Sequence, residues 1–226
     1  MYSYKNGLVT SVDLKVFVSD DWYKAGSTNF VRNFYYQTFA DINIACLQVP
    51  DPCDGVENCF NIVNGCAIAP SRNNLLATVP AALAYKASAE VFCDHSAPIN
   101  WAWTAILRLG TGQDYGAAGD RTFVLFRSSG SNKVHFATNN PEGYDHHEFT
   151  EITCTDGQWS TYTIEVTNRG SGQLSYVASV DGATIMSGNY ASSRAKTTGT
   201  LSAYVADNHY DPAPAYKVRN FFYQIF

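Results

Sequence analysis

Residues 155–166 read Thr-Asp-Gly-Gln-Trp-Ser-Thr-Tyr-Thr-Ile-Glu-Val. From Thr161 to Val166 polar and apolar side chains alternate, which is the pattern of a β-strand with one buried face. A turn rich in Gly, Ser and Asn follows at 168–172, then a second run at 173–180, and then the pair Asp181-Gly182. An Asp-Gly pair between two such runs is typical of a tight hairpin turn. This stretch therefore predicts three consecutive strands.

Short runs of the same kind fill the chain on both sides of this stretch. The expected strands are 83–93, 101–109, 121–128, 133–138, 149–155, 160–168, 173–180, 183–187, 199–207 and 217–226. The best helical candidate is the Ala-rich segment 79–89, but Pro80 and the Val91-Phe92 pair favour a strand. About ten short strands separated by turn residues predict an all-β sandwich of two sheets rather than a βαβ fold.

The composition of the 226-residue chain excludes several classes of protein. Hydrophobic residues make up 46%, so a real core can form, while charged residues reach only 15%, against about 25% in ordinary globular proteins. The net charge is −5, and the absence of a basic tract argues against a nucleic-acid partner. We expect no transmembrane span, because no apolar run reaches about 18 residues. The first residues do not have the pattern of a signal peptide.

Six cysteines predict a disulfide-bonded, secreted or cell-surface protein. They are Cys46, Cys53, Cys59, Cys66, Cys93 and Cys154. The spacing of the first four, C-x6-C-x5-C-x6-C, does not fit the usual zinc patterns. We expect two disulfides in the segment 40–66, for which three pairings remain open. The last two cysteines fall in expected strands, and by elimination we expect them to pair with each other.

The two ends of the chain repeat each other. Residues 31–39 read Val-Arg-Asn-Phe-Tyr-Tyr-Gln-Thr-Phe and residues 218–226 read Val-Arg-Asn-Phe-Phe-Tyr-Gln-Ile-Phe, identical at seven of nine positions with an offset of 187. Identities continue upstream, where Leu14, Val18, Asp20 and Tyr23 match Leu201, Val205, Asp207 and Tyr210. We therefore expect residues 1–39 to be the last strands of a preceding repeat, 40–66 to be a disulfide-stapled linker and 67–226 to be a complete module. The natural protein is then longer, with at least two tandem units.

Three strands cannot bury their inner face alone. We expect the tail to dock in its own module or to join modules by strand donation, which would build a filament when repeated. The expected assembly residues are Phe30, Phe34, Tyr36, Phe39, Phe221, Tyr223 and Phe226.

The Trp159 strand and the Asp181-Gly182 turn resemble the central hairpin of laminin-G-like domains, in the concanavalin-A-like superfamily. The closing strand, with its Val-x-Asn-Phe-x-Tyr pattern, is similar too, so the resemblance covers about 75–226. It implies a two-sheet jelly roll that acts as an adhesion, glycan-binding or matrix module. The expected Cys93–Cys154 pair departs from that family, whose disulfide is more often C-terminal.

The sequence offers no catalytic motif. Retaining glycosidases of this superfamily place carboxylates on one strand face as Glu-x-Asp-x-Glu or Glu-x-Asp-x-x-Glu. The nearest pair here, Glu148 and Glu151, falls on opposite faces of a strand. His146-His147 fits a polar loop. We therefore expect a protein that is not an enzyme.

Two kinds of binding site are candidates. The resemblance implies Ca²⁺ at a loop rim, with Asp207, Asn208, Asp211 and the repeat partners Asp20 and Asp21 as ligands; an Asx turn capping the strand is the alternative. Aromatic residues in turns are candidates for glycan binding: Trp22, Tyr210, Tyr115 and Tyr144. Trp101 and Trp103 share one strand face, where a place in the core is the alternative.

Two functions follow from these observations. The first is a non-catalytic extracellular structural or adhesive repeat, which binds further copies or neighbouring repeats and forms a matrix, fibre or cell-surface appendage. The second is a soluble or cell-surface lectin that binds glycans through its loop rim, and it depends on the analogy of fold.

Overall fold

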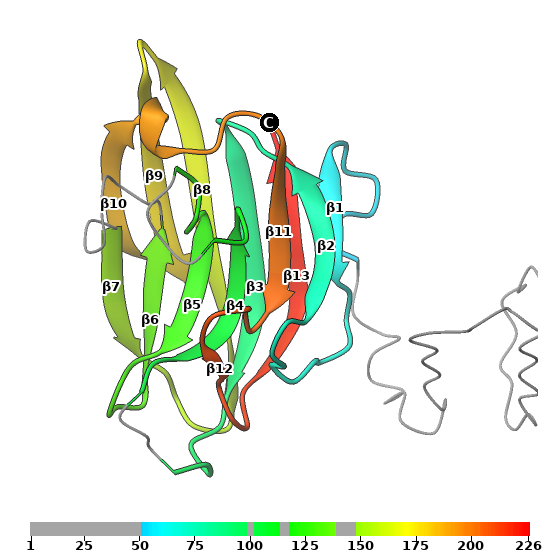
Figure 1. Cartoon of the computed structure of the whole chain (residues 1–226), viewed down its shortest axis with the longest axis vertical. Helices are drawn as coiled ribbons and strands as arrows, with labels where there is room; N and C mark the ends of the chain where they lie inside the picture. The colour runs from blue at the N-terminus through cyan, green and yellow to red at the C-terminus, as the bar shows by residue number, and fades with distance from the viewer. Residues whose placement is uncertain (1–50, 99–101, 114–117, 139–147) are drawn as a thin grey trace, which may run out of the picture. The chain divides into compact units, whose positions relative to one another are not determined.

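The computed structural model describes residues 51–98, 102–113, 118–138 and 148–226 (Figure 1). The chain divides into two compact units, 1–41 and 42–226, and the first of them lies outside the described residues. Within the described ranges the only helical element is a 3-10 turn, η3 (Ser192–Arg194). None of the described segments forms a helix long and apolar enough to cross a membrane.

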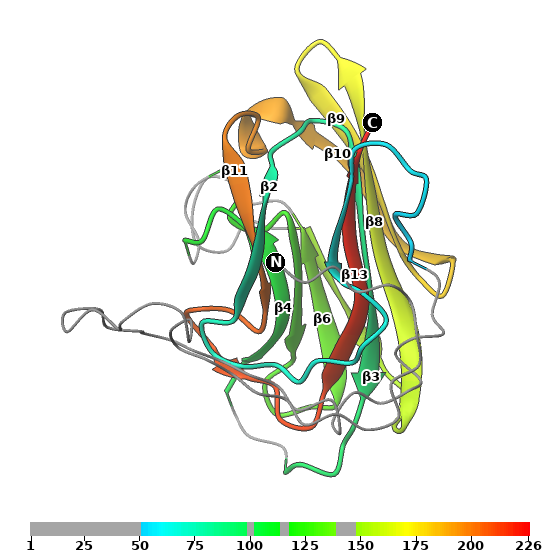
Figure 2. The same ribbon diagram turned by 90° about the vertical axis from the view of Figure 1, so that its right-hand side faces the viewer.

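Two antiparallel sheets make up the module, and Figure 2 shows them facing each other as two layers. The six-stranded sheet has the order β1 (Cys59–Val63), β13 (Lys217–Ile225), β3 (Tyr85–Cys93), β8 (Gln158–Gly170), β9 (Gln173–Val180) and β10 (Ala183–Ala191). The seven-stranded sheet has the order β2 (Leu75–Pro80), β11 (Thr200–Val205), β4 (Thr104–Gly110), β5 (Phe123–Arg127), β6 (Lys133–Thr138) and β7 (Glu148–Thr153), with β12 (Asp211–Pro212) paired to β4. The predicted fold class, an all-β jelly-roll sandwich, is confirmed.

The core lies between the sheets and follows from the alternation in sequence. In β8 the side chains of Tyr162, Ile164 and Val166 are buried, while Glu165 between them is exposed. Across the core, Phe123 of the seven-stranded sheet meets Phe221 of the other, with ring centroids 6.1 Å apart. Each such side chain contributes about 1.5–3 kcal/mol by leaving water, so the alternation accounts for the pairing of the two layers.

The predicted hairpin between β9 and β10 is present. Asp181 and Gly182 both have positive φ, 49° and 80°, as a two-residue type I′ turn requires. The Asp181 carboxylate accepts a hydrogen bond from the backbone N–H of Thr161 at 2.7 Å. This bond connects the turn to β8, the first strand of the three-strand motif.

The module begins earlier than the sequence indicated. Strand β1 lies within the segment 40–66, which was expected to be a linker, and it pairs with β13 from Cys59 to Val63. The boundary at residue 67 is therefore wrong. A disulfide joins Cys53 to Cys59, at the start of this strand. Cys46 lies outside the described residues, so the remaining pairing, Cys46 with Cys66, stays a prediction.

A second disulfide joins the two sheets. Cys93 ends β3 of one sheet and Cys154 directly follows β7 of the other, with Cα atoms 6.2 Å apart. Both residues are buried. The pairing left by elimination in the sequence is thus present, and it fastens the layers to each other at one end of the sandwich.

The C-terminal strand is an internal strand. β13 pairs with β1 on one side and with β3 on the other, so it has no open edge to offer to another chain. Phe221 and Tyr223 belong to the core, and only Phe226 is exposed. Phe221 and Tyr223 are therefore not available to another chain in this arrangement, and the expected role of Phe226 in assembly stays a prediction. The matching residues Phe30, Phe34, Tyr36 and Phe39 lie outside the described part of the chain.

Two residues of the repeated sequence have specific tasks in β13. Asn220 adopts φ 49° at a register shift in the strand, a conformation that Asn tolerates better than most residues. Its amide donates to Glu90 at 2.6 Å and accepts from the N–H of Gly65 at 3.1 Å. Arg219 pairs with Glu90 at 2.6 Å and covers the ring of Trp159 at 4.0 Å. The Arg-Asn pair therefore holds β13 against its neighbours.

Candidate functional site

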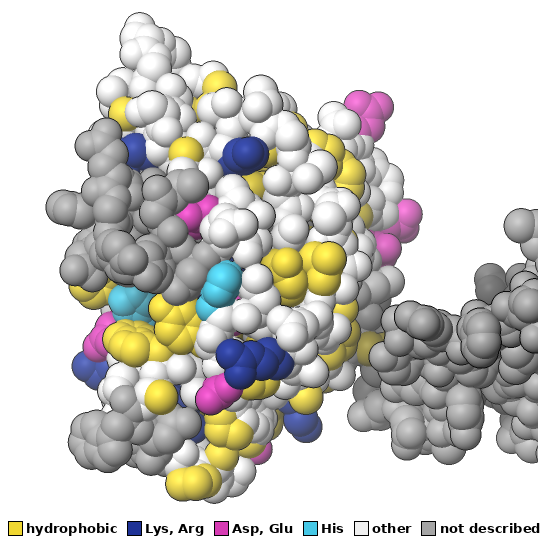
Figure 3. Space-filling view, viewed as in Figure 1, with side chains coloured by type: hydrophobic (Ala, Val, Ile, Leu, Met, Phe, Trp, Pro, Cys, Tyr) yellow, Lys and Arg dark blue, Asp and Glu magenta, His cyan; other side chains and the backbone are white. Residues whose placement is uncertain are grey.

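The outer face of the seven-stranded sheet carries a row of aromatic side chains. Phe126 lies on β5, His135 on β6 and Phe149 on β7, while Trp103 precedes β4 and Tyr210 precedes β12. The register pairs Phe126 with His135, so their side chains share a face. These five residues are called the aromatic row below. Figure 3 views this face and shows hydrophobic and histidine side chains gathered on it.

The rings of the aromatic row are in contact one after another. Phe149 stacks on His135 with centroids 4.8 Å apart, and Trp103 meets the other side of His135 edge-on, also at 4.8 Å. Trp103 lies 6.4 Å from Phe126, which in turn lies 4.9 Å from Tyr210. These spacings are those of favourable aromatic pairs, so the row is a preformed unit.

Two members of the row are open to solvent. Phe149 is 54% exposed and Trp103 is 37% exposed, whereas His135 between them is buried at 6%. Most large apolar side chains of the module are buried, so two exposed rings on both sides of one imidazole form a distinct surface feature. The row therefore offers ring surface to a ligand without any movement of the backbone.

Small buried residues and two arginines contact the Phe126 ring of the row. Ala105, Val124 and Ala206 form a small buried cluster with Phe126, against which Tyr210 packs. The guanidinium groups of Arg108 and Arg121 each lie 5.9 Å from the centroid of the Phe126 ring. Such cation–π contacts stabilise the ring position by about 0.5–2 kcal/mol.

A buried ion pair anchors the same region. Arg108 and Asp207 are fully buried, and their Nη2 and Oδ2 atoms are 3.3 Å apart. The other oxygen, Oδ1, accepts the backbone N–H groups of His209 at 2.9 Å and Tyr210 at 2.7 Å. Asp207 thus forms an Asx turn that holds Tyr210 in the row.

The structure does not assemble the expected calcium ligands. Asp207 accepts two backbone N–H groups with Oδ1 and lies beside Arg108 with Oδ2. Asn208 donates to the carbonyl of Gly112 at 3.0 Å, and Asp211 pairs with Arg72 at 3.1 Å. No group of three or more acidic, His or Cys side chains in the described ranges could hold a metal ion. Asp20 and Asp21 lie outside those ranges. The Asx-turn alternative therefore accounts for Asp207.

His135 and Glu151 lie opposite each other on β6 and β7. Glu151 accepts a short hydrogen bond from the Ser128 hydroxyl, and its second oxygen is 3.8 Å from the Lys133 ammonium. Burial lowers the pKa of His135 to about 4; Glu151 raises that pKa and Arg121 lowers it further. At neutral pH the imidazole in the row is therefore uncharged.

This pKa predicts a loss of stability in mild acid. The histidine of an unfolded chain titrates near 6.5, so between about pH 6.5 and 4 the unfolded state binds a proton that the folded state does not. The free energy of unfolding therefore decreases as the pH is lowered through this range. We expect His135 to contribute up to about 3 kcal/mol of this loss. His135→Phe retains a ring and should lack this slope in urea unfolding measured from pH 7.5 to 4. Equal slopes for the two proteins would contradict the assignment.

The sequence identified only part of the row. It singled out Tyr210, and it left Trp103 undecided between core and surface. Trp22, Trp101, Tyr115, Tyr144, His146 and His147 lie outside the described residues. Phe126, His135 and Phe149 were missed, although Phe149 stands between polar residues in its strand, at a position where a polar side chain is expected.

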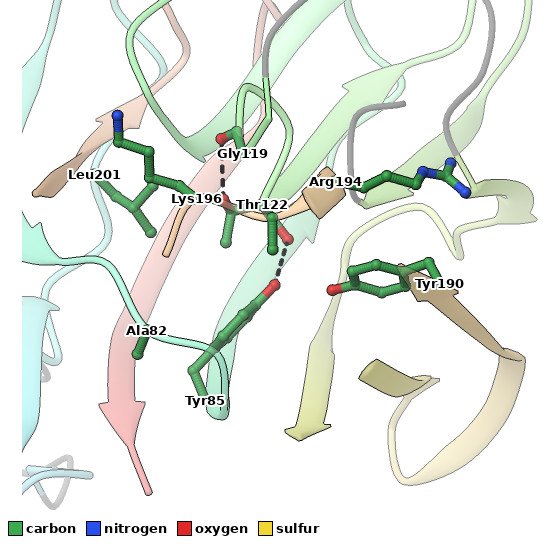
Figure 4. A pocket seen from close by; sticks show the side chains of 9 residues that line it. Ala82, Tyr85, Gly119, Thr122, Tyr190, Arg194, Lys196 and Leu201 are labelled. Carbon is green, nitrogen blue, oxygen red and sulfur yellow. Dashed lines mark hydrogen bonds between the residues drawn. The ribbon is translucent and has the colours of Figure 1, made fainter. Parts of the chain in front are cut away.

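A small pocket opens at one end of the sandwich, between the sheets (Figure 4). The hydroxyl groups of Tyr85 and Tyr190 point toward each other there, and Tyr85 donates to the carbonyl of Thr122 at 3.3 Å. Burial raises the pKa of Tyr190 to about 12, so its hydroxyl stays protonated. The enclosed space is about 10 Å³, roughly the room of one water molecule. The pocket is therefore a weaker candidate than the aromatic row.

Comparisons with known proteins assign no family to the chain. No family model and no curated protein matches the chain. Among solved structures, the receptor-binding domain of botulinum neurotoxin D is 14% identical with a TM-score of 0.44, over 74% of this chain and 40% of that one. The ligand-binding domain of botulinum neurotoxin serotype D in complex with N-acetylneuraminic acid gives 13% and 0.43, over 74% and 39%. An endo-β-1,4-glucuronan lyase from the fungus Trichoderma reesei gives 9% and 0.39, over 70% and 77%.

This chain spans about two fifths of the neurotoxin domains that it matches. Both the identities and the TM-scores are low, and the function of this chain is argued below from its own residues. The class that the described residues define is a disulfide-bonded jelly-roll sandwich with an aromatic row on one outer sheet face.

Proposed function

We propose that this module is a non-catalytic extracellular carbohydrate-binding domain that holds a glycan on the aromatic row. The observation that carries the proposal is the pair of exposed rings, Trp103 and Phe149, on both sides of the buried His135. A sugar ring has an apolar C–H face and a polar rim, so it pairs well with a flat aromatic surface bordered by polar groups.

Polar side chains at the border of the row supply that second requirement. Lys133 and Glu151 lie beside His135, and on the far side Asn208 and His209 lie against the carbonyl of Gly112. A few placed donors and acceptors around an apolar surface fix the orientation of a ligand. This arrangement favours glycan binding by the sheet face rather than by the loop rim alone.

The absence of catalysis is part of the proposal. Hydrolysis with retention needs two carboxyl groups about 5 Å apart, one of them available as a nucleophile. The described carboxylates near the row are engaged elsewhere: Asp207 with Arg108, and Glu151 with Ser128 and Lys133. These engagements support a binding role.

The extracellular location is supported by the disulfides, which persist in oxidising compartments. The Cys93–Cys154 bond joins two buried residues of the two layers, and such a bond is typical of secreted domains. We also propose that the module belongs to the laminin-G-like group. The order of β8, β9 and the Asp181-Gly182 turn supports this assignment.

We also propose that residues 1–39 belong to a preceding repeat of this sandwich. The identities at an offset of 187 include Asp207, Tyr210, Arg219 and Asn220, each of which has a specific structural task. A segment that keeps residues of this kind is suited to the same positions in a second module. Assembly of such modules into a fibre has less support, because β13 is paired on both sides.

The proposal is tested by two alanine variants and a matched control. Trp103→Ala and Phe149→Ala should each weaken binding to the recognised polysaccharide about tenfold or more, which corresponds to about 1.4 kcal/mol, because each removes an exposed ring face. Val177→Ala, an exposed apolar residue of the other sheet, should bind as the parent does. Affinity electrophoresis against a panel of neutral and acidic soluble polysaccharides gives the readout, and circular dichroism checks folding. Unchanged binding in both row variants would refute the proposal.

A further inference from the structure

Resting on the proposed function, we infer that the aromatic row binds an internal stretch of a neutral, unbranched polysaccharide that lies across the strands of the sheet. A single terminal sugar held in a pocket is the alternative mode. Two properties of the row separate these modes: its length and the pairing of the charges around it.

The row crosses much of the sheet. Its members belong to or adjoin β7, β6, β5, β4 and β12, which are successive neighbours in the hydrogen-bonded order. From Phe149 through His135 and Phe126 to Tyr210 the ring centroids are 4.8, 6.4 and 4.9 Å apart, so the row is at most about 16 Å long. Figure 3 shows hydrophobic and histidine side chains next to one another across this face. His135 and Phe126 are buried, so the accessible rings are Phe149, Trp103 and the half-buried Tyr210. One sugar ring covers only a part of this set, whereas several linked rings reach all of it.

Trp103 and Phe149 are exposed to solvent rather than enclosed. Phe149 lies on the edge strand β7 and is more than half exposed, and the pocket of Figure 4 contains no member of the row. A site for a chain end needs walls that close around the last sugar. An open row without such walls among the described residues is suited to a chain that continues past it on both sides.

Three cations among the described side chains near the row are each paired with a carboxylate. Arg108 is paired with Asp207, Lys133 with Glu151, and Arg72 with Asp211. An anionic sugar would be bound by charge-assisted hydrogen bonds from a cation that reaches it. Arg121 is buried at 7% exposure with its guanidinium over the ring of Phe126, and the His135 imidazole is neutral at pH 7 because its pKa is about 4. The row therefore favours uncharged sugars.

The test measures affinity against chain length by titration calorimetry. The probes are oligosaccharides of one to six units from the neutral polysaccharide that the module binds in the panel above. We expect affinity to rise about tenfold or more between two and five units and then to level off. Phe149→Ala, at one end of the row, should reduce this gain, and Val177→Ala should retain the full gain.

A second arm tests charge. A neutral galactan and a polygalacturonate of similar length are compared at 50 and 300 mM NaCl. We expect the galactan to bind more tightly, with little dependence on salt. A monosaccharide that binds as tightly as the hexamer, or a preference for the polygalacturonate that salt removes, would overturn the inference, while the proposed function would stand if Trp103→Ala abolished that binding. Absence of binding to every glycan would reject the proposed function itself.

Discussion

Replacing Asp207 with alanine is expected to lower the free energy of unfolding by about 3–5 kcal/mol, the usual cost of leaving one partner of a buried ion pair alone. Arg108 and Asp207 are both fully buried, so water cannot compensate the guanidinium. The same substitution removes the acceptor for the N–H groups of His209 and Tyr210. We expect urea denaturation at neutral pH to show a lower midpoint with an unchanged m value.

Two variants separate the causes of that loss. Asp207→Asn keeps an oxygen that can accept the two backbone N–H groups but removes the charge, so it should recover only part of the stability. Asp211→Asn breaks the exposed pair with Arg72, for which the expected change is below about 1 kcal/mol. Equal losses for Asp207→Ala and Asp211→Asn would show that the buried pair has no special weight.

Removing the disulfide between the sheets by the double substitution Cys93→Ala, Cys154→Ala is expected to cost about 4 kcal/mol. The bond closes a loop with a sequence separation of 61, and the entropy gained by the unfolded chain when a loop of that length opens corresponds to about this value. The variant should still fold, because the alternating core of β3, β8 and β9 is unchanged. Thermal and urea unfolding of the two proteins measure the difference.

The second disulfide provides the matched control. Cys53–Cys59 has a sequence separation of 6, so its removal should cost only about 2 kcal/mol by the same loop-entropy relation. A cost for Cys53→Ala, Cys59→Ala that equals or exceeds the cost for the long-range pair would contradict this account.

The expected strands at 133–138 and 173–180 coincide with β6 and β9, and most others differ from the observed bounds by a few residues. These segments alternate or are bounded by Gly, Asn and Asp turns, and both signals are local. β1 and β2 were missed because their side chains do not alternate: Cys59–Val63 is half-buried at four of five positions, and in Leu75–Pro80 only Val79 is buried. Such strands are stabilised by hydrogen bonds to β13 and β11, which lie far away in the sequence.

The aromatic row could not be predicted from the sequence for the same reason. Trp103, Phe126, His135 and Phe149 come from four separate segments, and only the register of β4 to β7 brings their rings within contact. Asp207 was predicted to be a calcium ligand because the sequence does not reveal its buried partner, Arg108, which lies about a hundred residues earlier in the chain. Neither relation leaves a local pattern.

The sequence alone determined that this chain forms a two-sheet sandwich and where its central hairpin turns, because alternation and turn chemistry act over a few neighbouring residues. The pairing of Cys93 with Cys154 followed by elimination among the six cysteines. The tertiary structure alone decided that β13 is internal, that Asp207 forms a buried ion pair with Arg108 and that an aromatic row crosses one outer face. These features arise from pairing between distant strands, whose register is fixed by burial of the whole core rather than by any one segment.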